Sequence, residues 1–272
     1  MLELLEYAFF RNALLGVIII GISSAIIGTY IITRRLTAIT GGITHACFGG
    51  LGLGYYLGMN PVIMASVFAI ASSIGVEWLS ERCRVREDSA IAVVWALGMA
   101  VGVLFVFMTP GYVPELNGFL FGNILTINSD DLWSFAIYTF ALIVFLALQY
   151  HSVVACAFDA DFAKVSGVKV KIIKNAMTLF VAIGIVLTIR LVGIMLLISM
   201  LTLPILIAEI YCRRFLLTMI ISVGISIVCS MAGLFLATLI EVPCSAMIVM
   251  VQVVVYMFVR IYRDTVMRRA MQ

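Results

Sequence analysis

The side chain best suited to chemistry in this sequence is the imidazole of His45, which lies in the stretch GGITHACFGGLGLG. A neutral imidazole can ligate a transition metal, and it can also carry a proton near neutral pH. Gly41 and Gly49 lie one helical turn before and after His45, so little bulk surrounds the ring. Because an ionisable side chain in a long apolar segment is a functional hypothesis by default, we take His45 as a candidate functional residue. The alternative is a histidine that only hydrogen-bonds a neighbouring helix.

The acidic candidate, Glu209, lies at the end of another apolar segment, one turn before Arg213. At that place a carboxylate pairs readily with neighbouring basic side chains, which is the simpler role for it. The sequence also lacks GxxxxGK(S/T), HExxH and GxSxG, the motifs of nucleotide-binding loops, metalloproteases and serine hydrolases. We therefore expect no catalytic residue, no permanently bound cofactor and no enzyme activity in this chain.

A connection between apolar segments, AFDADFAKVSGVKVKIIK, has the features of a short helix with a cap at each end. Asp159 can accept hydrogen bonds from the first backbone amides, residues 160–166 provide two turns, and Gly167 suits the left-handed position that ends a helix. Phe158 and Phe162 are four residues apart and lie on one side. That side could dock a partner protein, or the helix could be an ordinary anchor in the lipid interface.

Two of the apolar segments carry residues that affect helix packing. One has small residues at every fourth position, which are Gly42, Ala46, Gly50, Gly54 and Gly58. Such a ridge lets another helix approach to backbone contact. In a later segment, Pro204 cannot donate a hydrogen bond to the carbonyl of Met200, so we expect a kink or a break in that helix. Simple packing and the lining of a path across a membrane both remain open as roles for this break.

The composition places all of these features in a membrane protein. Of the 272 residues, 64% are hydrophobic and 11% are charged, whereas soluble proteins typically have about a quarter charged residues. Soluble enzymes, nucleic-acid-binding proteins and disordered chains are excluded, and we expect no nucleic acid partner. Since a helix needs about 20 apolar residues to cross a lipid bilayer, we predict an all-α, polytopic membrane helix bundle in a single domain over residues 1–272. The first residues, with Glu3 and Glu6, do not resemble a cleaved signal peptide.

The chain separates into nine apolar segments when it is cut at charge clusters and at proline, glycine and asparagine. These segments cover residues 12–33, 41–58, 61–79, 88–109, 131–150, 175–189, 191–211, 215–239 and 243–259. Nine transmembrane helices are therefore expected. A bundle of eight is the alternative, with 175–211 partly re-entrant, because this stretch is short for two crossings.

The basic residues are divided unequally between the two sets of connections. One set carries Arg34, Arg35, Arg82, Arg84, Arg86, Lys164, Lys169, Lys171, Lys174, Arg213, Arg214, Arg260, Arg263, Arg268 and Arg269. The other set carries Arg11 and Arg190. The positive-inside rule therefore predicts an N-terminus outside the cell and a C-terminus in the cytoplasm.

Four stretches occur in the order and spacing of a known family and extend over nearly the whole chain. They are GGITHACFGGLGLG, LNGFLFGNILTIN followed by Asp131, FDADFAKVSGV and VGIMLLISMLTLPILIA. With them the sequence resembles the permease subunits of ABC importers for zinc, manganese and iron. The resemblance implies a homodimer in the cell inner (cytoplasmic) membrane that transports a divalent metal ion. It also implies cytoplasmic ATP-binding subunits, which hydrolyse the ATP, and an extracytoplasmic metal-binding protein.

The resemblance further assigns roles to particular residues. FDADFAKVSGV is similar to the family's coupling segment, which sits in a groove of the ATP-binding subunit, and this makes residues 158–168 a cytoplasmic coupling helix. The implied coupling residues are Phe158, Asp159, Phe162, Ala163 and Gly167. The fourth stretch is similar to the family's Gly-to-Pro span, here Gly193 to Pro204. The implied translocation path includes Gly50, Gly54 and Pro204.

Gly41 departs from the family pattern. Members usually carry an aspartate four residues before the histidine, which places carboxylate and imidazole on one helical face as a transient cation site. Here His45 lacks that partner, and Glu209 is the candidate carboxylate from another span. Since an imidazole suits zinc better than manganese or iron, which prefer more oxygen ligands, we expect zinc first and then manganese or iron.

Two alternative functions remain on sequence grounds. An ATP-independent secondary carrier would move its solute on an ion gradient and would have inverted repeats and paired charges at the midplane. An ABC permease for a metal chelate or cobalamin would usually be a longer chain with ten spans. Co-purification with an ATPase separates the importer from the carrier, and the size of the substrate separates the importer from the chelate permease.

Overall fold

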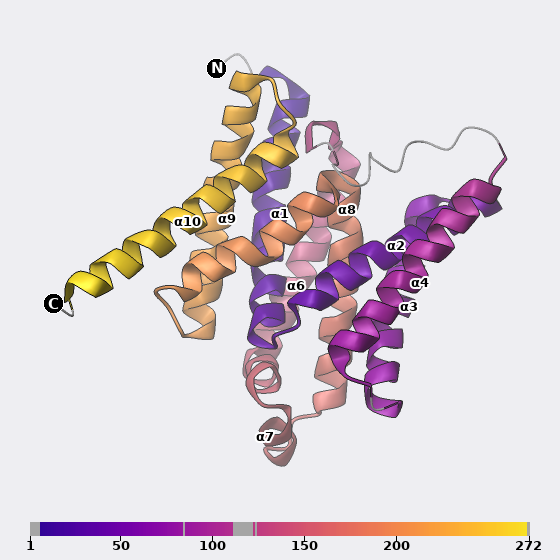
Figure 1. The fold of residues 1–272 in the computed structure, drawn as a ribbon, viewed down its shortest axis with the longest axis horizontal. Coiled ribbons are helices and arrows are strands. Elements are labelled where there is room, and N and C mark those ends of the chain that lie inside the picture. The colour runs from indigo at the N-terminus through magenta and orange to yellow at the C-terminus, as the bar shows by residue number, and fades with distance from the viewer. Residues whose placement is uncertain (1–5, 84, 111–121, 123, 271–272) are drawn as a thin grey trace. The chain divides into compact units, whose positions relative to one another are not determined.

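The computed structural model describes residues 6–83, 85–110, 122 and 124–270. All regular secondary structure in these ranges is helical, which confirms the predicted all-α class (Figure 1). The elements are α1 (Ala8–Thr33), α2 (Thr37–Leu57), α3 (Pro61–Arg82), α4 (Glu87–Met108), the 3-10 helix η2 (Ile124–Thr126), α6 (Ser129–Phe158), α7 (Ala160–Val165), α8 (Val170–Glu209), α9 (Phe215–Ile240) and α10 (Cys244–Ala270).

Eight helical stretches in the described residues are long and apolar enough to cross a membrane. They include both halves of α8, Val170–Ile189 and Leu191–Glu209, with 20 and 19 residues. At about 1.5 Å per residue each half is about 30 Å long, so the re-entrant alternative for 175–211 is not needed. The segment that fails this test is α2, because its many glycines lower its apolar character. All nine predicted segments are nevertheless helical.

The chain divides into two compact units. Unit 1 comprises Met1–Ile32, Leu120–Leu148 and Leu191–Gln272, and unit 2 comprises Thr33–Phe119 and Gln149–Arg190. Helices α6 and α8 are each shared between the units. Both have a residue with non-helical backbone angles close to the division, Gln149 in α6 and Gly193 in α8. Each unit is described by itself below, and the single permease domain over 1–272 stays a prediction.

In unit 1, the break in α8 lies at Gly193, where φ is 79° and ψ is 171°. Only glycine adopts this combination readily. The hydroxyl of Ser245 donates a hydrogen bond to the carbonyl of Val192 at 3.3 Å, which satisfies a backbone group beside the break. A Cβ atom at Gly122 would lie 2.2 Å from the carbonyl carbon of Val192, so two backbones meet here. Pro204 remains inside the helix, so of the kink or break expected there, the break is not found at this residue.

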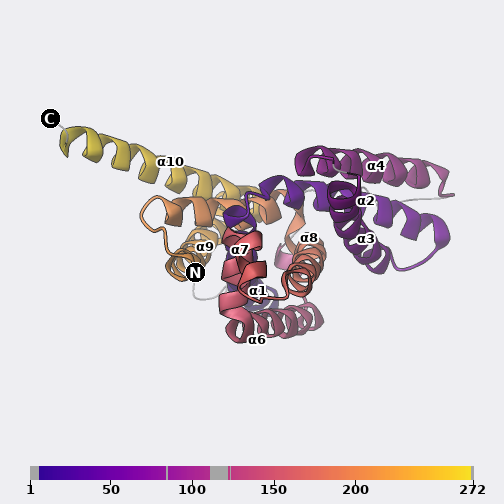
Figure 2. The same ribbon diagram turned by 90° about the horizontal axis from the view of Figure 1, so that it is seen from below.

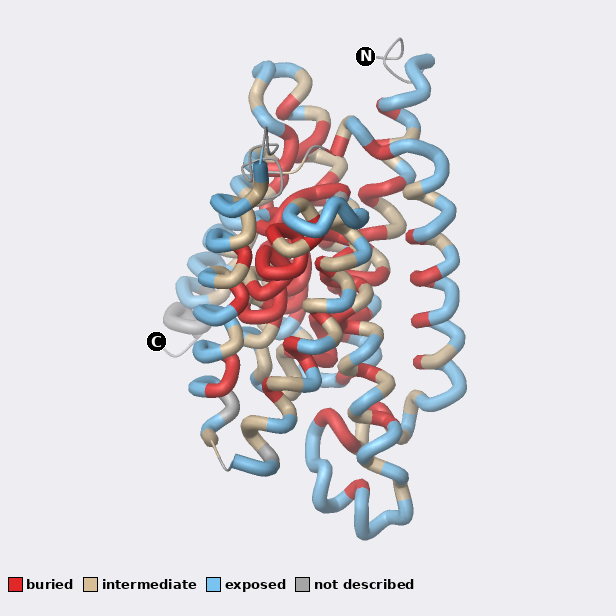
Figure 3. Tube along the Cα trace, turned by 90° about the vertical axis from the view of Figure 1, so that its right-hand side faces the viewer, coloured by how far each residue is buried: buried red, intermediate tan, exposed pale blue. Residues whose placement is uncertain are grey.

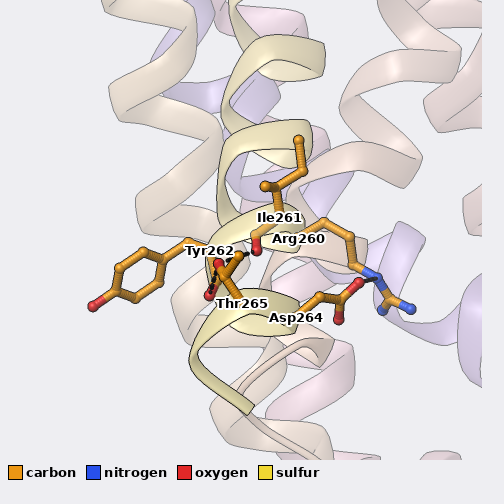
Figure 4. Close-up of polar contacts among 5 residues, drawn as sticks. All are labelled: Arg260, Ile261, Tyr262, Asp264 and Thr265. Atoms are coloured by element: carbon orange, nitrogen blue, oxygen red, sulfur yellow. Dashed lines mark hydrogen bonds and ion pairs between the residues drawn. The ribbon is translucent and has the colours of Figure 1, made fainter. Parts of the chain in front are cut away.

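The last helix of unit 1, α10, continues well beyond the predicted segment 243–259. Past that segment the Nε atom of Arg260 lies 3.7 Å from Oδ2 of Asp264, one turn later (Figure 4). The hydroxyl of Thr265 donates to the carbonyls of Ile261 and Tyr262 (Figure 4). The basic end of the chain is thus helical up to Ala270.

In unit 2, α2 lies between α3 and α4 (Figure 2). The predicted ridge of small residues makes this packing possible. A Cβ atom at Gly50 would lie 2.3 Å from the carbonyl oxygen of Met64 in α3. A Cβ atom at Gly98 of α4 would lie 2.4 Å from Cα of Ala46. The ridge therefore contacts two helices at backbone distance.

Buried and exposed residues alternate along several of the helices, while others are buried over long runs (Figure 3). Large apolar side chains are exposed in spans of both units, including Phe107 in α4 and Phe140 and Leu148 in α6. Exposed apolar side chains on long apolar helices suit contact with lipid rather than water.

Candidate functional site

His45 lies in the first half of α2 and packs face to face with an aromatic ring of α4. The rings of His45 and Trp95 are parallel within 4°, with centroids 4.5 Å apart. The Nδ1 atom of His45 is buried and has no hydrogen-bond partner among the described residues. The alternative of a histidine that hydrogen-bonds a neighbouring helix through Nδ1 is therefore not what the structure contains.

Trp95 also lies beside Gly41, the position that departs from the family pattern. A Cβ atom at Gly41 would lie 3.8 Å from Cζ3 of Trp95, which is an ordinary contact distance. The backbone position could therefore accept a side chain. In the part of the chain that the structure describes, no three His, Cys, Asp or Glu side chains are grouped so that they could hold a metal ion. A lone imidazole can bind a transition metal weakly and release it.

The capped helix predicted after the fifth apolar segment is present as α7. Oδ1 of Asp159 accepts hydrogen bonds from the backbone amides of Asp161 and Phe162, at 3.0 and 2.9 Å. Gly167 has a φ of 82° and follows the helix end. The amide of Gly167 donates to the carbonyl of Lys164, and the next amide along the chain donates to the carbonyl of Ala163. These two bonds form a Schellman motif, so both predicted caps of α7 are confirmed.

Apolar side chains are exposed on α7 and at the end of α6 just before it. Phe158 and Phe162 are 63% and 65% exposed, and Val165 is 88% exposed. Ala163, also in α7, is buried. The coupling residues predicted from the sequence thus lie in and beside α7, with Phe158 as the last residue of α6, Asp159 as the N-cap and Gly167 after the helix end. Their role in coupling stays a prediction at this point.

The residues predicted for the translocation path lie in separate places. Gly50 and Gly54 belong to unit 2, where the backbone of α3 fills the space beside them. Pro204 belongs to unit 1 and lies within α8. The geometry gives the two glycines a packing role, and a contribution to the path stays a prediction for all three.

The predicted spans contain another carboxylate besides Glu209. Glu209 is exposed at the end of α8 in unit 1, whereas His45 belongs to unit 2. A second carboxylate, Glu77 in the predicted segment 61–79, was missing from the candidates above. Its Oε1 atom lies 3.2 Å from Nζ of Lys174, and the two side chains are only 19% and 22% exposed. An acidic residue inside an apolar segment was the available signal.

Known proteins that resemble this chain match it along most of its length. The model of the ABC 3 transport family matches residues 6–263. A probable metal transport system membrane protein of Chlamydia pneumoniae is 33% identical over 228 residues, which cover 82% of this chain and 78% of that protein. The manganese transport system membrane protein MntC of Listeria monocytogenes is 28% identical over 253 residues, which cover 93% of this chain and 90% of that protein.

The fold is also similar to a solved structure, PsaBC from Streptococcus pneumoniae in complex with Fab. The TM-score is 0.83 at 24% identity, and the match covers 95% of this chain and 93% of the other. At this identity the likeness shows a common fold. Together with the family match over almost the whole sequence, it agrees with the resemblance found in the four stretches. The chain therefore belongs to the ABC 3 transport family, the membrane components of ABC transporters.

Proposed function

We propose that this chain is the permease subunit of an ATP-driven importer for divalent metal ions in the cell inner membrane. It acts as a homodimer, with cytoplasmic ATP-binding subunits on one side and an extracytoplasmic metal-binding protein on the other. The names of two relatives, a probable metal transport protein and a manganese transport protein, support a metal as cargo. The metal ion passes through and is not retained, so a weak site is appropriate.

The observation that carries this proposal is the geometry of α7. Both ends of this helix are capped, and Phe162 of α7 and Phe158 at the end of α6 are exposed in the connection that the charge distribution assigns to the cytoplasm. Exposed aromatic side chains on a rigid element are typical of the anchors of a protein interface. A groove in the ATP-binding subunit would bury them, and movement of that subunit would then move α7.

For the cargo, we place the transient contact at His45 and prefer zinc to manganese or iron. Supporting this choice, the imidazole has no carboxylate at Gly41, and manganese and iron favour oxygen ligands more than zinc does. The stacked ring of Trp95 fixes the plane of the imidazole, so a metal ion would approach it along the ring edge. Glu209 is retained as a weaker candidate metal ligand in unit 1.

The test is uptake of radioactive zinc into proteoliposomes that contain the permease and its ATP-binding subunit, with the metal-binding protein added outside. We expect uptake that requires ATP. The double variant Phe158→Ala/Phe162→Ala should lose the ATP-binding subunit on purification and lose uptake. Lys164→Gln is the matched control, because this exposed α7 residue is two positions from Phe162 and therefore points to the other side of the helix. Uptake without ATP, unchanged in the double variant, would show that the chain is a secondary carrier instead.

The metal preference has its own test in the substitution Gly41→Asp. This change supplies the missing carboxylate one turn from His45, and the contact distance at Gly41 allows a side chain. We expect manganese to compete more strongly with zinc for uptake than in the wild type. Gly41→Asn, which has the same shape without the charge, should leave the preference unchanged. Strong competition by cobalamin or a metal chelate would instead favour the chelate permease.

A further inference from the structure

The coupling helix and the histidine helix belong to the same compact unit. Unit 2 contains α7, the first half of α8, and α2, α3 and α4. α8 begins at Val170, directly after the loop that follows α7. Lys174 lies one turn into α8, so a displacement of α7 reaches this side chain over a short length of chain.

Lys174 pairs with Glu77 of α3 at 3.2 Å. Both side chains are largely buried, so water screens their attraction less than it would on a surface. Removal of one partner from such a pair leaves an unpaired charge in a poorly hydrated place, which is unfavourable. The ion pair therefore opposes separation of α8 from α3. An apolar contact at the same place would let the two helices slide past each other more easily.

From Glu77 the packing continues to His45 through a buried cluster. The neighbouring residue Val76 is 2% exposed and packs with Ala90 and Ile91 of α4. A Cβ atom at Gly42 of α2 would lie 2.5 Å from Cγ2 of Ile91. Gly42 lies less than one turn before His45. The three helices can therefore move as one body, and His45 and Trp95 would move with it.

We infer that the Glu77–Lys174 ion pair is the mechanical link that carries displacement of α7 into the helices around His45. The pair positions the metal-contacting helix and does not itself contact the metal. This inference rests on the proposed function, because it requires that α7 receives the movement of an ATP-binding subunit. Beyond the proposed function, it identifies Glu77 and Lys174 as residues through which ATP hydrolysis is coupled to the release of the metal ion.

The experiment measures zinc uptake and ATP hydrolysis in the same proteoliposomes, and the readout is zinc transported per ATP hydrolysed. For Glu77→Gln we expect ATP hydrolysis to continue and this ratio to fall about tenfold, the size of a typical coupling between two sites. The charge exchange Glu77→Lys/Lys174→Glu should restore most of the ratio. A Glu77→Gln protein with the wild-type ratio, or a charge exchange that restores nothing, would overturn the inference.

The control is a different ion pair, Arg260–Asp264. It lies within one helix and both side chains are about half exposed, so Asp264→Asn should leave the ratio unchanged. If Glu77→Gln reduces assembly of the complex, the double variant Glu77→Gln/Lys174→Met removes both charges together. The ratio of zinc transported to ATP hydrolysed is then measured in the double variant instead. A wild-type complex without ATP-dependent zinc uptake would contradict the proposed function itself. If the wild type shows this uptake and Glu77→Gln transports as much zinc per ATP hydrolysed, only the role of the Glu77–Lys174 pair would be contradicted.

Discussion

Helix α7 and the surroundings of His45 both belong to unit 2, but the contacts that shape them come from different distances along the chain. The caps of α7 come from Asp159 and Gly167, at the ends of the helix itself. The ring of His45 is instead held by Trp95 of α4, and α2 is held by the close approach of α3 and α4. Substitutions in α7 should therefore act locally, whereas substitutions around His45 should act through the packing of three helices.

The largest effect is expected from Gly50→Ala, which tests the packing side of this comparison. The new Cβ atom would lie 2.3 Å from the Met64 carbonyl oxygen, so a backbone must shift. We expect a loss of stability of about 3 kcal/mol, at the upper end for overpacking. Thermal unfolding of the purified protein measures it. Gly75→Ala is the matched control, because its nearest neighbour would be 4.0 Å away. Equal stability of the two variants would show that α2 and α3 are not in backbone contact.

An intermediate effect is expected from His45→Ala. We expect zinc uptake to fall by about tenfold or more, because even partners of a metal ligand change metal affinity by about 10–100-fold. Purification with the ATP-binding subunit should be unchanged, since α7 is not altered. His151→Ala, the same substitution at the other histidine, should retain wild-type uptake. A parallel loss in both histidine variants would remove His45 from the metal path.

The smallest effect is expected from Asp159→Ala, which tests the local side of the comparison. The two backbone amides at the start of α7 lose their acceptor, which costs about 1 kcal/mol for a typical helix cap. Affinity for the ATP-binding subunit should fall about fivefold, while the stability of the rest of the protein is retained. Titration of the purified subunits measures this affinity. A general loss of stability would mean that α7 is not a local element.

The same distinction explains what could be predicted from the sequence. Asp159 and Gly167 have their partners within a few residues, so both caps of α7 followed from residue type and spacing alone. The stacking of Trp95 on His45 and the pairing of Glu77 with Lys174 join residues far apart in the chain. Such contacts depend on how the helices are arranged, so they could not be predicted from spacing in the sequence. The nine helical segments followed from apolar length, because each must satisfy its backbone groups within itself.

The break in α8 shows how a local rule can be misapplied. Pro204 lacks one donor, and a neighbouring group can compensate for one missing hydrogen bond, so the helix continues through it. Gly193 can adopt backbone angles that other residues avoid, and its break is supported by Ser245 and by the close backbone at Gly122. Those supports come from other elements of unit 1. The sequence therefore indicated a break in this helix but not its residue.

The most direct test of the proposed function compares, in one preparation, a variant of the coupling residues with a variant of the candidate metal ligand. Zinc uptake and ATP hydrolysis are measured together in proteoliposomes carrying wild type, Phe158→Ala/Phe162→Ala or His45→Ala. The account predicts that the aromatic variant loses the ATP-binding subunit and both activities, and that His45→Ala keeps the subunit but loses uptake. Wild-type uptake in the aromatic variant, or uptake that needs no ATP, would contradict it.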